Sequence, residues 1–478
     1  MSDPNTPPSP QSPAPFDANK PHMAVPKLRP VRLFPAQSAP DAQGNVQQAI
    51  GIADARQISD RVVFAAPAVQ LILPMLDGEK TLDEIVAAVG RGLTRPTLEQ
   101  FVAQLDDASL LNGPTFDALL SKIRADFDSS DTLPPAATAA FAEQLGASEM
   151  GEEAAQSTSD ERYERGAARL PSLMDQWIDE VLKNTDRPSF DTLPRAVMAP
   201  HIDYGRGWMN YASVWGRMRV VDRPARVVIL GTNHFGTSTG VCLCDKGYET
   251  PLGTSPLARD LFDALKKHLG QENAARALAN RYDHEREHSV ELQVPWIQHC
   301  LGQSDNGSYV PVLGILVHDP SVASGASYDG QGLDFDSFIK ALRAAIADLE
   351  KAGMGKTLLV ASVDLSHVGT VFGDEGTLAG DEQEQQQKRD KVLNHDREML
   401  QLFEQGKIDE MLASMAWQQN PTRWCSLGAM AATLKTLGIA SKADGADATT
   451  GGVRLLNYVA AMDDQGLSLV SHAAAVIE

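Results

Sequence analysis

Residues 226–234 read RVVILGTNH, an apolar run that ends in a histidine. The same pattern occurs at residues 196–201, AVMAPH, and at residues 358–367, LLVASVDLSH. Near-continuous apolar runs of this length are typical of strands that are buried on both faces of a sheet. Open α/β sheets bind their ligands outside the carboxyl ends of the strands. The pattern therefore predicts an α/β sheet with His201, His234 and His367 at one edge.

Strand-like and helix-like segments alternate through the rest of residues 168–478. Two further apolar runs are typical of strands, YVPVLGILV at residues 309–317 and SLVSHAAAVI at residues 468–477. Helical periodicity occurs at residues 207–219, 256–270, 335–352, 381–406 and 426–438. This alternation predicts an α/β domain with a mostly parallel central sheet that is covered by helices on both faces.

The composition of the 478 residues excludes several classes of protein. A net charge of −21 argues against nucleic acid as a partner. Four cysteines in so long a chain do not form a disulfide framework, which indicates a reducing cytoplasm. The N-terminus has neither the charged nor the apolar region of a signal peptide, and no run approaches the about 20 apolar residues of a membrane span. We therefore expect a cytoplasmic protein without a membrane partner.

The first 115 residues predict a tail and a small domain. Residues 1–45 are rich in Pro, Ser, Ala and Gln, which predicts disorder. Residues 46–115 combine a short strand or hairpin and a helix that ends at Asp77 and Gly78 with two further helices. The first of these two has a capping box at Thr81 and Glu84, and the second opens at Pro96. Helices with a small β-element favour a mostly helical, winged-helix-like domain.

Two helical stretches of this domain resemble the PqqD-like peptide-recognition domains. They read LDGEKTLDEIVAAV at residues 76–89 and LEQFVAQLDDASLL at residues 98–111. The resemblance implies a site for a peptide, and the alternative is a structural helical cap. Residues 116–167 predict a linker with helical segments, because residues 146–162 are acidic, rich in small residues and aperiodic.

The strand-end histidines are the first candidates for chemistry. Gly231 and Gly236 flank His234 and are expected to let the backbone turn tightly around it. Asp364 precedes His367 by three residues, a spacing at which the carboxylate can fix the imidazole tautomer. The alternative is that Asp364 caps a following turn.

Residues 283–296, DHEREHSVELQVPW, hold a second group of ionisable side chains. His284 and His288 are four residues apart, so on one helix they would share a face. The order differs from the HExxH of zinc proteases, which argues against that class. Glu287 and His288 are expected to open a helix and to bond to substrate or pocket walls. The alternative is a solvated charged turn.

Cys425 lies in TRWCSLGAM, at the predicted N-terminus of a helix. A helix N-terminus lowers a thiol pKa and favours the thiolate, which binds metals and attacks carbon. The alternative is a small core residue. Cys242, Cys244 and Cys300 are predicted to be structural.

Six blocks, from PHIDYGRG and VVILGTNHFG to the closing SLVSHAAAVI, resemble the Memo family in order across residues 168–478. That family includes the bacterial AmmeMemoRadiSam system protein B, and its fold is related to the class III extradiol dioxygenases. The resemblance implies metal ligands at His201, His234 and Cys425, with Asp364 and His367 beside the metal. Where the usual family block reads PHAGY, this chain has Ile202 and Asp203, and Asp203 adds a carboxylate near the site.

Two functions follow from these features. The first is a metal-dependent, dioxygenase-like oxidoreductase with catalytic residues His367, Asp364 and His288. Its metal would be Fe(II) or copper, with zinc as a further candidate, because a thiolate ligand is softer than the carboxylate of the dioxygenases. The second is a non-catalytic accessory protein that binds a metal or a peptide. The system name implies a radical-SAM partner protein, and fold alone does not choose between the two.

Overall fold

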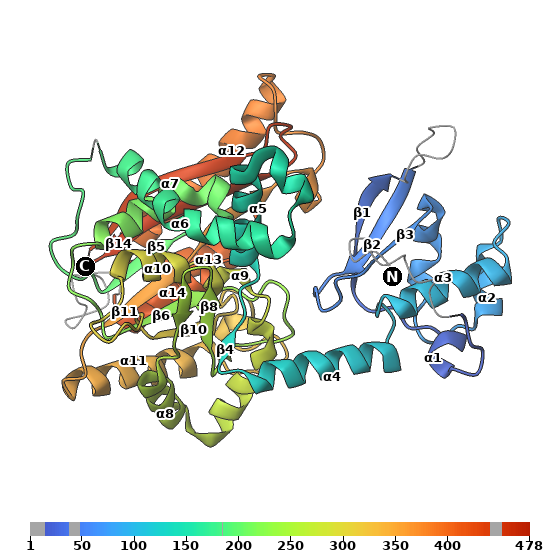
Figure 1. Ribbon diagram of the computed structural model, residues 1–478, viewed down its shortest axis with the longest axis horizontal. Helices are drawn as coiled ribbons and strands as arrows, with labels where there is room; N and C mark the ends of the chain where they lie inside the picture. Colours follow the sequence, from blue (N-terminus) through green and yellow to red (C-terminus); the bar gives the residue numbers. More distant parts are fainter. Residues whose placement is uncertain (1–14, 38–47, 184, 440–451) are drawn as a thin grey trace. The chain divides into compact units, whose positions relative to one another are not determined.

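The computed structural model describes residues 15–37, 48–183, 185–439 and 452–478. The chain divides into two compact units, Met1–Ser129 and Ser130–Glu478, which are coloured blue to cyan and cyan to red in Figure 1. Within the described residues, none of the helices combines the length and the apolar character that crossing a bilayer requires.

The N-terminal unit packs helices against an antiparallel sheet of the order β1-β2-β3. The capping box predicted at Thr81 and Glu84 is confirmed, since the Thr81 hydroxyl accepts from the Glu84 backbone N–H and the Glu84 carboxylate accepts from that of Thr81. Leu82, Ile85 and Leu98 are fully buried. The elements of this unit are β1 (Val31–Gln37), β2 (Gln48–Asp54), β3 (Val62–Ala65), α1 (Pro21–Ala24), α2 (Leu82–Val89), α3 (Arg95–Asp107), α4 (Pro114–Ser129) and the 3-10 helices η1 (Pro67–Leu71) and η2 (Leu73–Met75).

Residues 15–37 differ from the disorder predicted for residues 1–45. They form α1 and β1, and β1 pairs along its whole length with β2. Composition misled the prediction here, because an apolar strand in a proline-rich segment gains its order from a partner strand that composition does not reveal. The remainder of that predicted tail, residues 1–14 and 38–45, lies outside the described residues.

Residues 130–167 are not a linker but part of the large unit. They contribute β4 (Thr132–Leu133), α5 (Ala137–Met150), the 3-10 helix η3 (Gly151–Gln156) and the start of α6 (Ser159–Leu182). A Cβ on Gly146 would lie 1.7 Å from the Arg162 carbonyl oxygen, and one on Gly166 would lie 1.7 Å from that of Ala142. The small residues that suggested a linker therefore allow the backbones of α5 and α6 to come into contact.

Eight of the described strands form the central sheet of the large unit, in the order β12-β14-β5-β11-β6-β10-β7 with β13 beside β14. Neighbouring strands are parallel from β5 through β11 and β6 to β10, and antiparallel in the other pairs. The strands are β5 (Ala196–Ala199), β6 (Arg226–Gly231), β7 (Cys242–Leu243), β10 (Val312–Leu316), β11 (Thr357–Ser362), β12 (Asp364–Val368), β13 (Val453–Met462) and β14 (Leu469–Ile477).

The α/β class is therefore confirmed, but the sheet is mixed rather than mostly parallel. The run at residues 468–477 became β14, which is buried along its whole length and antiparallel to β5. An apolar run reports burial on both faces and carries no information on strand direction.

Helices cover both faces of this sheet (Figure 1). One face carries α8 (Arg259–Leu278), α11 (Phe335–Lys351), α13 (Ile408–Gln418) and α14 (Leu427–Leu437), and α14 packs on β6 and β11. The other carries α6, α7 (Tyr204–Trp215), α9 (His288–Glu291) and α10 (Val294–Leu301). The further elements are α12 (Gln383–Glu404), which packs on β12 and β13, β8 (Gly247–Thr250), β9 (Gly253–Ser255) and the 3-10 helices η4 (Gly216–Met218), η5 (Arg281–His284), η6 (Ala323–Gly325) and η7 (Thr370–Phe372).

Candidate metal centre

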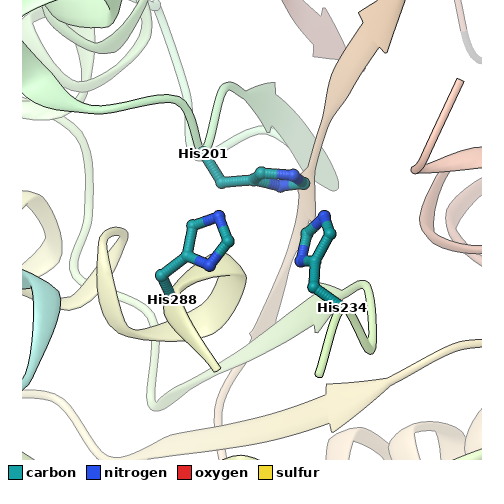
Figure 2. Close-up of side chains that lie close together, drawn as sticks. All are labelled: His201, His234 and His288. Carbon is teal, nitrogen blue, oxygen red and sulfur yellow. The ribbon is translucent and has the colours of Figure 1, made fainter. Parts of the chain in front are cut away.

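Three histidines converge beyond the carboxyl ends of β5 and β6. Within the described part of the chain, ligand nitrogens of His201, His234 and His288 all lie within 4.8 Å of one another. Figure 2 shows their rings turned toward a common space. His201 follows β5 and His234 follows β6, as predicted, while His288 opens α9. The structure therefore adds His288, predicted as a pocket residue, to the two strand-end histidines.

Two glycines allow α9 and the segment before it to approach β6. A Cβ on Gly231 would lie 2.5 Å from the Ser289 hydroxyl oxygen, and one on Gly236 would lie 2.2 Å from the Asp283 carboxyl carbon. Neither glycine has a positive φ angle. Their observed role is the close approach of a second segment, which brings His288 toward His234.

Cys425 joins this cluster from the loop before α14. Its Sγ lies 3.4 Å from Nε2 of His201. Burial raises the pKa of the Cys425 thiol, but His201 and His234 outweigh burial and hold that pKa well below its ordinary value. The thiolate predicted from a helix N-terminus is therefore favoured chiefly by neighbouring imidazoles.

Glu287 is the buried partner of His234. Its Oε1 lies 3.0 Å from Nδ1 of His234, and its Oε2 accepts a 2.7 Å hydrogen bond from the His234 backbone N–H. Burial opposes the charge of this carboxylate, but His234 outweighs burial and lowers the Glu287 pKa to about 2. Since Nδ1 is engaged, Nε2 of His234 is the nitrogen left for a ligand.

Asp364 pairs with His201 rather than with His367. It accepts a 3.0 Å hydrogen bond from the His201 backbone N–H, and its Oδ2 lies 3.7 Å from Nε2 of His201. Nδ1 of His367 instead lies 2.9 Å from the Leu365 carbonyl oxygen and 3.2 Å from that of Arg423. The pairing predicted from a spacing of three residues is wrong, because β12 is extended there and successive side chains point to opposite faces.

His284 does not share a helix face with His288. It ends η5, separately from α9, and its two nitrogens lie 3.2 Å from the Tyr248 hydroxyl and 3.2 Å from the Cys242 carbonyl oxygen. Burial lowers the pKa of His284 to about 4. Burial also dominates at His288 and, despite the opposing charge of Glu287, lowers its pKa to about 4, so both imidazoles are neutral at pH 7.

The remaining predicted residues lie outside the cluster. Asp203, expected to add a carboxylate to the site, caps α7 and pairs with Arg206. Burial raises the thiol pKa at Cys242, Cys244 and Cys300, and all three side chains are buried, as expected of structural cysteines.

Asp396 is a residue that the sequence analysis missed. It is fully buried on α12, where Oδ1 accepts from Ser366 at 2.5 Å and from the Trp424 indole N–H at 2.8 Å. Oδ2 accepts from Tyr458 at 2.7 Å and from Ser471 at 2.5 Å. Ser366 adjoins His367 on β12 and Trp424 adjoins Cys425 in the loop before α14, so this carboxylate ties β12 to that loop behind the site. The available signal was a carboxylate on the apolar face of an otherwise amphipathic helix.

Comparisons with known proteins agree with these features. A family model described as Memo-like protein matches residues 157–476. A MEMO1 family protein of Methanopyrus kandleri is 28% identical over 320 residues, which cover 66% of this chain and 89% of that relative. One of Thermotoga neapolitana is 29% identical over 178 residues, which cover 36% of this chain and 54% of the relative, so the chain spans about half the length of that protein. One of Desulfurococcus amylolyticus is 34% identical over 127 residues, 26% of this chain and 42% of the relative.

The match to the family model extends over more than half of the chain and includes the histidine cluster, Cys425 and Asp396. The family resemblance carried by the strand-end motifs is thereby confirmed. This chain belongs to the Memo-like protein family.

Proposed function

We propose that the large unit binds one transition-metal ion through His201, His234 and His288, with Cys425 as a fourth ligand. The convergence of the three imidazoles carries this proposal. Metal–nitrogen and metal–sulfur bonds are about 2.0–2.3 Å long, so neighbouring ligand atoms of a tetrahedral ion lie about 3.3–3.8 Å apart. The three nitrogens, within 4.8 Å of one another, would have to approach by no more than about 1.5 Å, and Sγ of Cys425 already lies 3.4 Å from Nε2 of His201.

Two members of the cluster, His288 and Cys425, have protonation states that suit metal binding, whereas the charges of their neighbours raise the pKa of His201 and His234, so a metal ion would have to displace a proton from each of those two imidazoles. A metal ligand must be a neutral imidazole or a thiolate. His288 is neutral at pH 7 because its pKa is about 4, and the Cys425 thiol has a lowered pKa. Glu287 holds the Nδ1 side of His234, and a carboxylate in that position orients a metal-binding imidazole and raises its basicity.

Three imidazoles and one thiolate suit iron, copper or zinc. A redox-active iron or copper ion would supply one-electron chemistry with O2, which makes a metal-dependent, dioxygenase-like oxidoreductase the reaction class of the proposal. His367 would hold or move a proton at Nε2, since its Nδ1 faces two carbonyl oxygens. Asp364 would keep His201 in position through the backbone hydrogen bond.

Elemental analysis of protein purified without oxygen tests the metal site. We expect about one metal ion per chain, and a loss of at least tenfold in occupancy for His201→Ala, His234→Ala, His288→Ala and Cys425→Ala. Cys300→Ser is the matched control, because that thiol is buried in α10 away from the cluster. Equal occupancy in all variants would overturn the ligand set. Oxygen uptake by the metal-loaded protein tests the proposed oxidoreductase activity. We expect His367→Ala to lose this uptake while it keeps its metal.

A second candidate is an accessory protein that presents a peptide to a partner such as a radical-SAM enzyme. The observation that favours it is the outward face of the N-terminal sheet. Phe34 and Phe64 meet edge to face there, and Phe64 is 59% exposed. A hollow of about 740 Å³ adjoins them, lined by Leu33, Phe34, Ile50, Pro67 and other residues of β1, β2 and η1. A bound metal without oxygen uptake, together with peptide binding that Phe64→Ser abolishes, would select this function.

A further inference from the structure

A second cavity lies at the opposite ends of the strands that carry the histidines. It has a volume of about 500 Å³. Arg195 and Lys356 in its lining immediately precede β5 and β11, and Thr436 and Leu437 end α14. The stretch of α11 from Arg343 to Glu350 completes the lining. The cavity is therefore distinct from the metal centre and goes beyond the proposed function.

The charge of this cavity is opposite to that of the protein. Among the described lining residues it has three cationic side chains, Arg195, Arg343 and Lys356, and one carboxylate, Glu350. The whole chain carries a net charge of −21. A local excess of positive charge in so acidic a protein indicates a site for an anion rather than a general feature of the surface.

The charges of the lining are not equally available. Glu350 accepts from Lys356 at 3.2 Å and from the Thr357 backbone N–H at 3.1 Å, so Lys356 is already paired. One guanidinium N–H of Arg195 donates to the Leu437 carbonyl oxygen at 2.8 Å. Arg343, by contrast, is exposed at the cavity, and none of its N–H donors is used by a residue that the structure describes.

Thr436 supplies an independent sign that a ligand belongs here. Its side chain is 7% exposed, and its hydroxyl has no hydrogen-bond partner within the described residues. A buried polar group without a partner costs about 1–3 kcal/mol, so such groups in native proteins usually meet a ligand, a water or an ion. Gly438 leaves room for the Arg343 side chain beside the end of α14, because a Cβ at that position would lie 3.0 Å from the Arg343 guanidinium.

We infer that this cavity binds an organic phosphate monoester, with Arg343 and Thr436 at the phosphate. A guanidinium fork matches phosphate oxygens in pairs, and a dianion suits the net positive lining. The apolar body of the ligand would lie against the rest of the lining, which is contributed by Leu193, Pro194, Ile346, Ala347, Leu359 and Leu437. The volume is within the range of about 300–1,000 Å³ of small-molecule sites.

Isothermal titration of the full chain with phenyl phosphate tests this inference. We expect one phenyl phosphate per chain, weaker binding of inorganic phosphate and no binding of phenol. Arg343→Gln should weaken the binding of phenyl phosphate at least tenfold, and Thr436→Val should weaken it severalfold. Lys340→Gln is the matched control, because Lys340 is an exposed cation of the same helix outside the cavity lining.

Two results would overturn the inference. One is an absence of phenyl phosphate binding by the wild-type chain, and the other is equal weakening by Arg343→Gln and Lys340→Gln, which would indicate attraction to general charge. Metal content and the urea unfolding midpoint establish that each variant is folded. If Arg343→Gln does not fold, Arg343→Lys replaces it, since that variant keeps the charge and loses the paired donors.

Discussion

The two ends of β5, β11, β6 and β10 differ in chemistry although the strands between them are alike. Every residue of these strands is buried. Beyond the carboxyl ends stand imidazoles, carboxylates and a thiol, whereas the amino ends carry guanidinium and ammonium groups. The six residues of β11 separate the two ends by about 20 Å at 3.3 Å per residue. The length of the strands therefore sets the distance between the two candidate sites, while the first residues beyond the strands determine what each end can bind.

Substitution of Asp396 is expected to cause the largest loss of stability. Asp396→Ala would remove the acceptor of the Tyr458 and Ser471 hydroxyls and one of the two acceptors of Ser366 and Trp424, at a cost of about 3–5 kcal/mol in the free energy of unfolding. Urea unfolding measures this loss. Asp396→Asn keeps one acceptor oxygen and should lose less. If Asp396→Ala is as stable as wild type, the carboxylate does not tie β12 to the loop that carries Cys425.

Glu287→Gln should separate the two ends functionally. Loss of the charge beside His234 should weaken metal binding about 10–100-fold, the range found for partners of metal-binding imidazoles. Metal affinity is measured by competition with a chelator. Phenyl phosphate binding should stay within twofold of wild type, since Glu287 lies at the carboxyl ends of the strands. A parallel loss of both would show that the two ends are coupled.

His284 should make the carboxyl-end segment sensitive to acid. Burial lowers its pKa from an ordinary value near 6.5 to about 4, so the unfolded chain binds the proton first. The contribution of neutral His284 to the free energy of unfolding is therefore fully present above pH 6.5. It falls as the pH drops from 6.5 to 4, by up to about 3 kcal/mol. In His284→Gln the decline between pH 7 and pH 4 should be shallower by that amount.

Deletion of residues 1–129 should have the smallest effect on either end. The boundary after Ser129 separates two compact units, and both candidate sites consist of residues of the large unit. We expect metal content and phenyl phosphate affinity within twofold of the full chain. A truncated chain that folds but has lost its metal would make the N-terminal unit part of the metal centre.

Sequence patterns predicted the edge of the sheet at which the site lies but not all of its contacts. His201 and His234 could be placed because each ends an apolar run, and a strand buried on both faces must leave the core at its end. Cys425 came from the family resemblance and from its place before a helix. The partnership of Glu287 with His234 could not be predicted, because it depends on how closely α9 approaches β6 across Gly231. That approach is a tertiary contact between segments more than 50 residues apart.

The errors in the fold have equally specific causes. Apolar runs do not report strand direction, so the sequence predicted a mostly parallel sheet although β14 pairs antiparallel with β5. Small residues indicate both linkers and close helix pairs, and Gly146 and Gly166 belong to a pair. Asp396 was hidden because a single carboxylate within a charged helix attracts no notice until Trp424 and Tyr458 are seen to converge on it.

The position of Trp424 gives the molecule an optical reporter of its own. This indole is 2% exposed and directly precedes Cys425, whereas Trp417 on α13 is 89% exposed. A paramagnetic ion at the histidine cluster would quench the blue emission of the first, while iodide in solution would quench the red emission of the second. Because the chain has six tryptophans, the difference in fluorescence between the wild type and Trp424→Phe would record the arrival of copper or iron in real time.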